Sequence, residues 1–107
     1  MISLNDIDLH DAVLKKIDIN VSDGTVTLSI DYFESADSVR RTELLLLFSE
    51  VSAISNIVDV SMLKDNARSG NVGYWHLAGG EVPTYIYLVG GCISITAKSA
   101  SVINLKK

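Results

Sequence analysis

The sequence feature that most constrains the fold is a strict alternation of apolar and polar residues across residues 25–32. An apolar residue occupies every second position from Val26 to Tyr32, and Thr, Ser or Asp occupies the positions between. This period of two is typical of a β-strand with one buried and one exposed face. Within residues 12–21, Ile17, Ile19 and Val21 alternate in the same way with Asp18 and Asn20. Asp23-Gly24 between the two segments favours a type I′ turn. The sequence therefore predicts a β-hairpin over residues 12–33.

Further strands are predicted downstream of this hairpin. Residues 44–48 read Leu-Leu-Leu-Leu-Phe, which indicates a central strand covered on both faces. Residues 70–77 are typical of a strand with glycine bends. Residues 84–89 and 92–97 flank Gly90-Gly91, a second two-residue hairpin turn. Val102, Ile103 and Leu105 extend the last strand or add another.

One helix is predicted within residues 52–67. Apolar residues recur there at a spacing of three to four, with Ser55 as the candidate N-cap and Asn66 and Gly70 as stop signals. A β-branched cluster around Ile57 limits the helix to two or three turns. The predicted fold is mainly β (α+β), a twisted antiparallel sheet of about five to seven strands built from hairpins, with one short helix packed on it.

Length and composition indicate the number of domains and the cellular compartment. The chain has 107 residues, 48% of them apolar, which suits a single domain over residues 1–107 with its own core. The lone Cys92 excludes an internal disulfide, so we expect a reducing cytoplasm. The N-terminal stretch lacks a basic region and carries Asp6, Asp8 and Asp11, so no secretory signal is expected. No apolar run is long enough to span a bilayer.

The net charge of −4 is distributed unevenly along the chain. Residues 1–38 hold eight acidic and two basic residues, whereas residues 39–107 hold five acidic and seven basic residues. An acidic surface repels phosphate backbones, so nucleic acid is not an expected partner. We expect instead a non-enzymatic interaction module that binds a basic protein. The candidate partner-binding residues are Asp18, Asp31, Glu34 and Asp37. The alternative is that the acidic charge serves solubility alone.

A second hypothesis, from a different functional class, rests on polar and aromatic residues outside this acidic set. If they converge, the chain is a small-molecule-binding or enzymatic domain. Metal sites usually need three or four ligands, and the chain has two histidines, so neither a metal nor a cofactor is expected. The bland alternatives are a turn at residues 10–11 and core packing of the tryptophan. The candidate pocket residues are Asp8, His10, Asp11, Trp75 and His76.

Two further features bear on chemistry and on self-association. Alternation places Cys92 on the face opposite Ile93 and Ile95, but nothing in the sequence pairs it with a base, so we expect a structural cysteine and no catalytic residue. Residues 84–89 and 92–97 carry no charge, so an exposed strand edge there would pair with a second copy. A homodimer is therefore expected.

Three stretches of the chain are similar to sequences of a known kind. They are Leu9–Leu14, Val51–Ile57, and Gly70–Trp75 followed by Tyr85–Gly91. Together they resemble a loose group of small uncharacterised bacterial proteins of about this length. Some similar proteins are immunity partners of polymorphic bacterial toxins. The resemblance implies a bacterial cytoplasmic domain, with an immunity or regulatory partner as one reading of its function.

Overall fold

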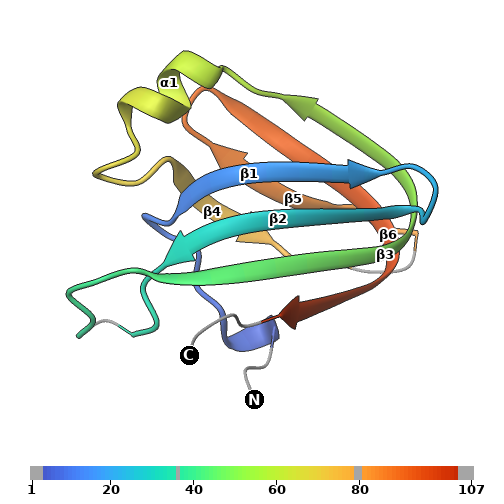
Figure 1. The fold of residues 1–107 in the computed structure, drawn as a ribbon, viewed down its shortest axis with the longest axis horizontal. Coiled ribbons are helices and arrows are strands. Elements are labelled where there is room, and N and C mark those ends of the chain that lie inside the picture. Colours follow the sequence, from blue (N-terminus) through green and yellow to red (C-terminus); the bar gives the residue numbers. More distant parts are fainter. Residues whose placement is uncertain (1–3, 36, 79–80, 104–107) are drawn as a thin grey trace.

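An antiparallel sheet with the strand order β1-β2-β3-β6-β5-β4 is the framework of the protein (Figure 1). The computed structural model describes residues 4–35, 37–78 and 81–103, and this part of the chain contains six strands, one α-helix and a 3-10 turn. The predicted fold class, a mainly β antiparallel sheet with one short helix packed on it, is confirmed. The elements are the 3-10 turn Leu4–Asp6, β1 (Val13–Asn20), β2 (Thr25–Tyr32), β3 (Thr42–Ile57), α1 (Val60–Asp65), β4 (Val72–His76), β5 (Thr84–Leu88) and β6 (Gly91–Ile103).

The first predicted hairpin is present, but its turn is longer than the sequence suggested. Asn20 pairs with Thr25, so four residues rather than two connect β1 to β2. Gly24 adopts a φ of 69°, and its N–H donates to the Asn20 carbonyl at 3.0 Å. Asp23 is not in the left-handed region; its N–H donates to Asn20 Oδ1 at 3.0 Å. Hydrogen bonds to Asn20, including one to its side chain, therefore close this connection in place of a type I′ turn.

The second predicted hairpin is also present, shifted by one residue. Leu88 pairs with Gly91, so the turn consists of Val89 and Gly90, and Gly91 already belongs to β6. Strand β6 then continues through Ala97 to Ile103, which confirms the extension for Val102 and Ile103, whereas Leu105 lies outside the described residues.

The two long strands β3 and β6 join the two halves of the sheet. β3 pairs with β2 over residues 42–48 and with β6 over residues 45–57. The ladder between β3 and β6 is interrupted near Glu50, which has a φ of 51°, and its register shifts between Val51 and Ala53. Beyond this point β6 pairs with β5 on its other side. The sheet therefore folds over, and Figure 1 shows β4 and β5 behind β1 and β2.

The core fills the space between the two halves of the folded sheet. Inward-facing side chains from both halves are fully buried, including Leu28 on β2, Leu46 on β3, Ile86 on β5 and Ile95 on β6. The expectation that residues 44–48 would be covered on both faces is wrong. Leu44, Leu46 and Phe48 are buried, but Leu45 and Leu47 are partly exposed on the outer face, because no second layer packs there.

The predicted helix is much shorter than its sequence pattern and begins later. Residues 52–57 belong to β3, where Ser55 pairs with Ser94 of β6, so Ser55 is not a cap. The N-cap is Asp59, whose Oδ1 accepts from the Met62 N–H at 3.0 Å. Pairing with β6 outweighs the three-to-four spacing of the isoleucines in this segment. In the described residues no helix has the length and apolarity needed to cross a membrane.

Candidate functional site

Three of the five predicted pocket residues lie around one shallow hollow. Asp8, Trp75 and His76 line an open depression of about 320 Å³ at the edge strand β4. The Trp75 ring is only partly exposed and packs against the core, and its Nε1 donates to the Ile7 carbonyl at 3.1 Å. The buried part of the Trp75 ring therefore stabilises the fold, and a ligand in the hollow would contact only its exposed part. The other lining residues are Leu4, Ile7, Tyr74 and Leu77.

His10 and Asp11 are not among the residues that line this hollow. His10 Nδ1 lies 3.3 Å from Asp11 Oδ2, and both side chains are exposed. The His10 N–H donates to Asp8 Oδ1 at 2.9 Å, and Asp11 has a φ of 63°, so the segment forms a tight turn before β1. Within the described residues no group of three His, Cys, Asp or Glu side chains is placed to hold a metal ion. His10 and Asp11 both lie in this turn, and the His10 side chain is 68% exposed rather than packed against the sheet edge.

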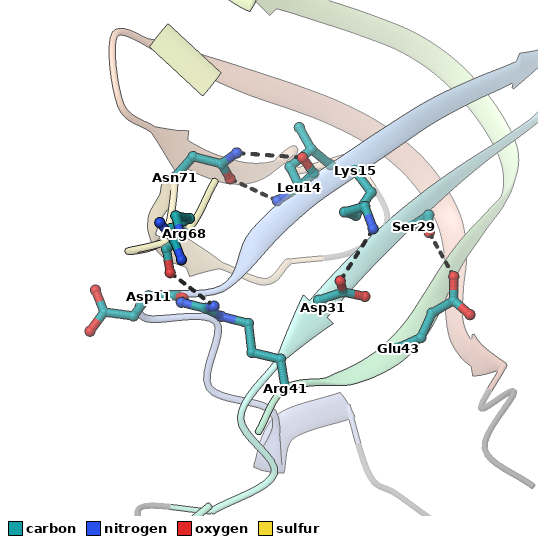
Figure 2. Close-up of polar contacts among 9 residues, drawn as sticks. All are labelled: Asp11, Leu14, Lys15, Ser29, Asp31, Arg41, Glu43, Arg68 and Asn71. Atoms are coloured by element: carbon teal, nitrogen blue, oxygen red, sulfur yellow. Dashed lines mark hydrogen bonds and ion pairs between the residues drawn. The ribbon is translucent and has the colours of Figure 1, made fainter. Parts of the chain in front are cut away.

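Two of the four predicted partner-binding residues share a face of the sheet. Asp18 on β1 pairs with Thr27 on β2, and Asp31 lies four residues further along β2, so both side chains point outward. Glu43 on β3 pairs with Asp31 and adds a third carboxylate to this face. Part of this charge is offset by Lys16, which pairs with Ser29 on the same face, and by the ion pair between Lys15 Nζ and Asp31 Oδ2 at 3.4 Å (Figure 2). This outer face of β1, β2 and β3 is called the acidic face below.

The other two predicted partner-binding residues follow β2 in the chain. Glu34 and Asp37 are exposed and lie in the connection between β2 and β3. The Glu34 charge acts on Tyr32: burial, and after it this carboxylate, raises the pKa of the Tyr32 phenol above its ordinary value. Asp31 and Glu43 therefore lie side by side, Asp18 lies four strand positions away, and Glu34 and Asp37 lie in the connection that follows β2.

A polar network that the sequence did not reveal holds the sheet edges together. Figure 2 shows Asn71 beside β1, where its Oδ1 accepts from the Leu14 N–H at 2.7 Å. Its Nδ2 donates to the Leu63 carbonyl at 3.0 Å. Arg41 donates through Nε and Nη2 to the Asp11 carbonyl and through Nη1 to the Arg68 carbonyl. These bonds connect β1, β3 and the segment before β4. Asn71 and Arg41 are therefore structural residues.

Among the described residues, the outer face formed by β4, β5, residues 53–57 of β3 and residues 92–96 of β6 carries no Asp, Glu, Lys or Arg, and the Lys98–Glu50 ion pair lies beyond Thr96. The register places alternate residues of β3, β6, β5 and β4 side by side there, and we call this surface the tyrosine face. Its members are Ala53, Ser55, Ile57, Tyr74, His76, Tyr85, Tyr87, Cys92, Ser94 and Thr96.

The tyrosines of this face stack on one another. The Tyr74 and Tyr87 ring centroids lie 4.6 Å apart at an interplanar angle of 25°, and Tyr85 and Tyr87 lie 6.1 Å apart. Crowding by these neighbours desolvates the Tyr87 phenol, and that desolvation, followed by the proximity of Tyr74, Cys92 and Tyr85, raises its pKa. The sequence held a signal for this surface, because the alternation in residues 84–89 already placed two tyrosines on one side of a strand.

Comparison with known proteins gives no relative for this chain. No protein-family model matches the sequence, and searches of curated proteins and of solved structures give no significant match. The candidate surfaces therefore have to be judged by the chemistry of the residues that form them.

Proposed function

We propose that the chain is a non-enzymatic protein-interaction module that binds a basic partner protein through its acidic face. The observation that carries this proposal is the placement of Asp18, Asp31 and Glu43 on one outward-facing surface, together with the exposed Glu34 and Asp37 that follow β2. Clustered carboxylates on a rigid sheet raise the rate at which a basic surface associates in the correct orientation.

The resemblance noted for the sequence is consistent with this role. Immunity proteins and regulatory partners act by covering a surface of another protein, and a toxin that acts on nucleic acid carries a basic surface of its own. The proposal therefore places the protein in the cytoplasm, where such a partner would be neutralised or regulated.

The test compares two variants that change the net charge equally. The first replaces the four predicted residues, as Asp18→Asn, Asp31→Asn, Glu34→Gln and Asp37→Asn. The control removes four acidic charges elsewhere, as Asp6→Asn, Glu50→Gln, Asp65→Asn and Glu81→Gln. Association rates are measured, at two salt concentrations, with the partner captured on the immobilised wild-type protein.

The first variant should associate several-fold more slowly than the control variant, and the difference should shrink at high salt because the Debye length shortens from about 10 Å at 0.1 M to about 3 Å at 1 M. Equal rates for both variants would assign these carboxylates to solubility alone.

The alternative, a small-molecule-binding or enzymatic domain, is favoured by one observation. Asp8, Trp75 and His76 combine an acceptor, an aromatic surface and a titratable ring around the same hollow. A screen of small molecules by NMR chemical shifts would support it if His76→Ala abolished a specific shift at Trp75 while leaving the rest of the spectrum unchanged. Shifts that persist in His76→Ala would reject the hollow as the binding site.

A further inference from the structure

A groove with basic side chains at its rim lies between the edge strand β1 and the helix α1 (Figure 1). It has a volume of about 290 Å³, and its apolar walls include Ile17 on β1 and Val58, Val60 and Leu63 on or just before α1. The exposed Lys16 and Lys64 lie on its two sides. The groove therefore differs in chemistry both from the acidic face and from the uncharged tyrosine face.

The inner side of β1 is incompletely covered along this groove. The inward-facing Val26 and Leu28 of β2 are fully buried, whereas their partners on β1, Ile19 and Ile17, are not. Ile19 is 47% exposed, Val60 on the α1 side is 72% exposed, and no residue of α1 is buried. Apolar side chains that continue the core are therefore open to solvent here, and a partner with apolar side chains would bury them.

Strand β1 also offers the freest edge of the sheet. β5 and β6, where the sequence suggested an exposed edge, are interior strands, so the edges are β1 and β4. The N-terminal segment covers part of β4, because Trp75 Nε1 donates to the Ile7 carbonyl. On β1, no hydrogen bond outside the β1–β2 ladder uses the backbone of residues 15–19 within the described part of the chain. Unpaired backbone groups of this kind are where an extended segment adds to a sheet.

The lysines determine which kind of segment can add to this edge. The register of β1 shifts at Lys15, so regular pairing with an added strand is confined to residues 16–20. A lysine at an edge disfavours a neutral or basic strand, whereas an acidic strand neutralises its charge. Lys15 already pairs with Asp31, but Lys16 and Lys64 have no ion-pair partner among the described residues. Their charges are therefore available to the carboxylates of a partner.

We propose that this groove binds an extended acidic segment of another protein, which adds to β1 as a further strand. Alternate side chains of the segment are apolar and fill the groove against Ile17 and Val60, because alternate residues of a strand share a face. Carboxylates near one end of the segment meet Lys16 and Lys64, and uncharged residues lie beside Asp18. In this mode of recognition main-chain hydrogen bonds supply affinity and the side-chain groove supplies specificity. The groove opens on the inner side of β1 and the acidic face on its outer side, so either surface can act without the other.

The probe is a synthetic peptide with capped termini in which valine alternates with glutamate in one half and with serine in the other. A length of roughly eight residues, at about 3.4 Å per residue, is enough to pass the free part of β1. In an NMR titration of the isotope-labelled chain with up to about 1 mM peptide, the amides of residues 16–20 and 60–65 should shift and those of β4 should not.

Two double variants with the same change in net charge test the lysines. Lys16→Glu with Lys64→Glu should weaken binding of the peptide at least about tenfold, because attraction becomes repulsion at both sides of the groove. The control is Arg40→Glu with Lys98→Glu, which changes two exposed bases in the β2–β3 connection and on β6 and should leave binding within about twofold. Circular dichroism confirms that each variant is folded.

Modified peptides test strand addition itself and need no variant of the chain. The peptide with lysine in place of glutamate should not bind. Of two peptides methylated on alternate backbone nitrogens, one should lose binding at least about tenfold and the other less, because only every second N–H of an added strand points toward β1.

Several outcomes would overturn the proposal. They are the absence of binding by the acidic peptide up to about 1 mM, equal binding of the acidic and basic peptides, and equal weakening by the two double variants. Equal binding of the two methylated peptides would exclude strand addition. Shifts of the same amides by dodecanoate but not by the peptide would assign the groove to an anionic amphiphile. Shifts that follow the concentration of the chain alone would assign the edge to a second copy.

Discussion

Replacing Asn71 with alanine should cost the protein a large part of its stability. The Asn71 side chain is 2% exposed and connects the start of β4 to β1 and to the end of α1. Its Oδ1 accepts from the Leu14 N–H at 2.7 Å, and its Nδ2 donates to the Leu63 carbonyl at 3.0 Å and to the Leu14 carbonyl at 3.5 Å. Asn71→Ala removes all three bonds and leaves a small void that offers no replacement partner.

The magnitude follows from the two shorter bonds. A buried backbone group left without a partner costs about 1–3 kcal/mol, and two such groups are left here. The Leu63 carbonyl is only partly buried, so water recovers some of the loss at that end. We therefore expect the free energy of unfolding to fall by about 2–4 kcal/mol, against a total of about 5–15 kcal/mol for domains in general.

Urea unfolding, followed by the fluorescence of the single Trp75, measures this loss. The matched control is Asn56→Ala, which removes the same group from an exposed position on β3 and should change stability by less than about 0.5 kcal/mol. A loss below about 1 kcal/mol for Asn71→Ala would refute the reasoning, because it would mean that the backbone groups find other partners.

The variant Asn71→Asp tests the same contacts through the pH dependence of the free energy of unfolding. A carboxylate would face the Leu63 carbonyl without a proton to donate, so folding should raise the pKa of the new carboxyl above about 3.9. The destabilisation should then be present at neutral pH and diminish as the pH falls below the raised pKa, where the protonated carboxyl can donate. A penalty that does not change with pH would contradict this.

Three further predictions concern single positions. Gly24→Val should lower the free energy of unfolding by about 1 kcal/mol or more in urea titrations, purely through its φ of 69°, since a Cβ there meets no atom within 4 Å; an unchanged midpoint would refute it. Gly91→Ala should cost more than Gly24→Val, because its Cβ would overlap the Ile57 carbonyl oxygen across the β3–β6 ladder, and the same titration ranks the two. Burial and Glu34 raise the pKa of Tyr32 above 10.0, so wild-type stability should fall once the unfolded phenol ionises above about pH 10. In thermal melts at about pH 9 and pH 11, Tyr32→Phe should lose less stability over this interval than the wild type, and an equal loss would contradict the assignment.

The parts of the fold that were predictable from the sequence are those with local signals. Alternation over residues 12–33, with glycine at the reversal, was enough to find the β1–β2 hairpin, because strand pairing there involves near neighbours in the chain. The turn itself was misassigned, since the Asn20 side chain closes a longer loop and a dipeptide rule does not include it. Local signals therefore located the hairpin without giving its turn geometry.

The start of the helix was mispredicted where a distant segment decides the structure. Residues 52–57 carry isoleucines at helical spacing, yet Ile54 pairs with Ile95 and Ile57 with Cys92, about 40 residues away. Their burial is also uneven: Ile57 is exposed on the tyrosine face while Ile54 packs against the core. The spacing of three to four residues arises because these isoleucines lie on both faces of one strand. Only the position of the partner strand distinguishes this arrangement from a helix.

The candidate surfaces were predictable in part. Strand alternation correctly placed Asp18 and Asp31 on one face, because face assignment within a hairpin needs only the register. The sequence could not tell that Asp8 and His76 would line one hollow without His10, since that depends on how the N-terminal segment packs against β4. The roles of Arg41 and Asn71 could not be predicted either, because their partners are backbone carbonyls and amides, which no side-chain motif encodes.

The continuity of β3 and β6 through both halves of the sheet has a consequence for how the protein can come apart. If one half of the sheet opened alone, it would have to break the β3–β6 ladder, which also holds the other half. Partial opening is then expected only at β1 and β4, whose amides should exchange with solvent sooner than those of β3 and β6. The edge strands β1 and β4 therefore open locally, whereas the β3–β6 ladder opens only when the whole chain unfolds.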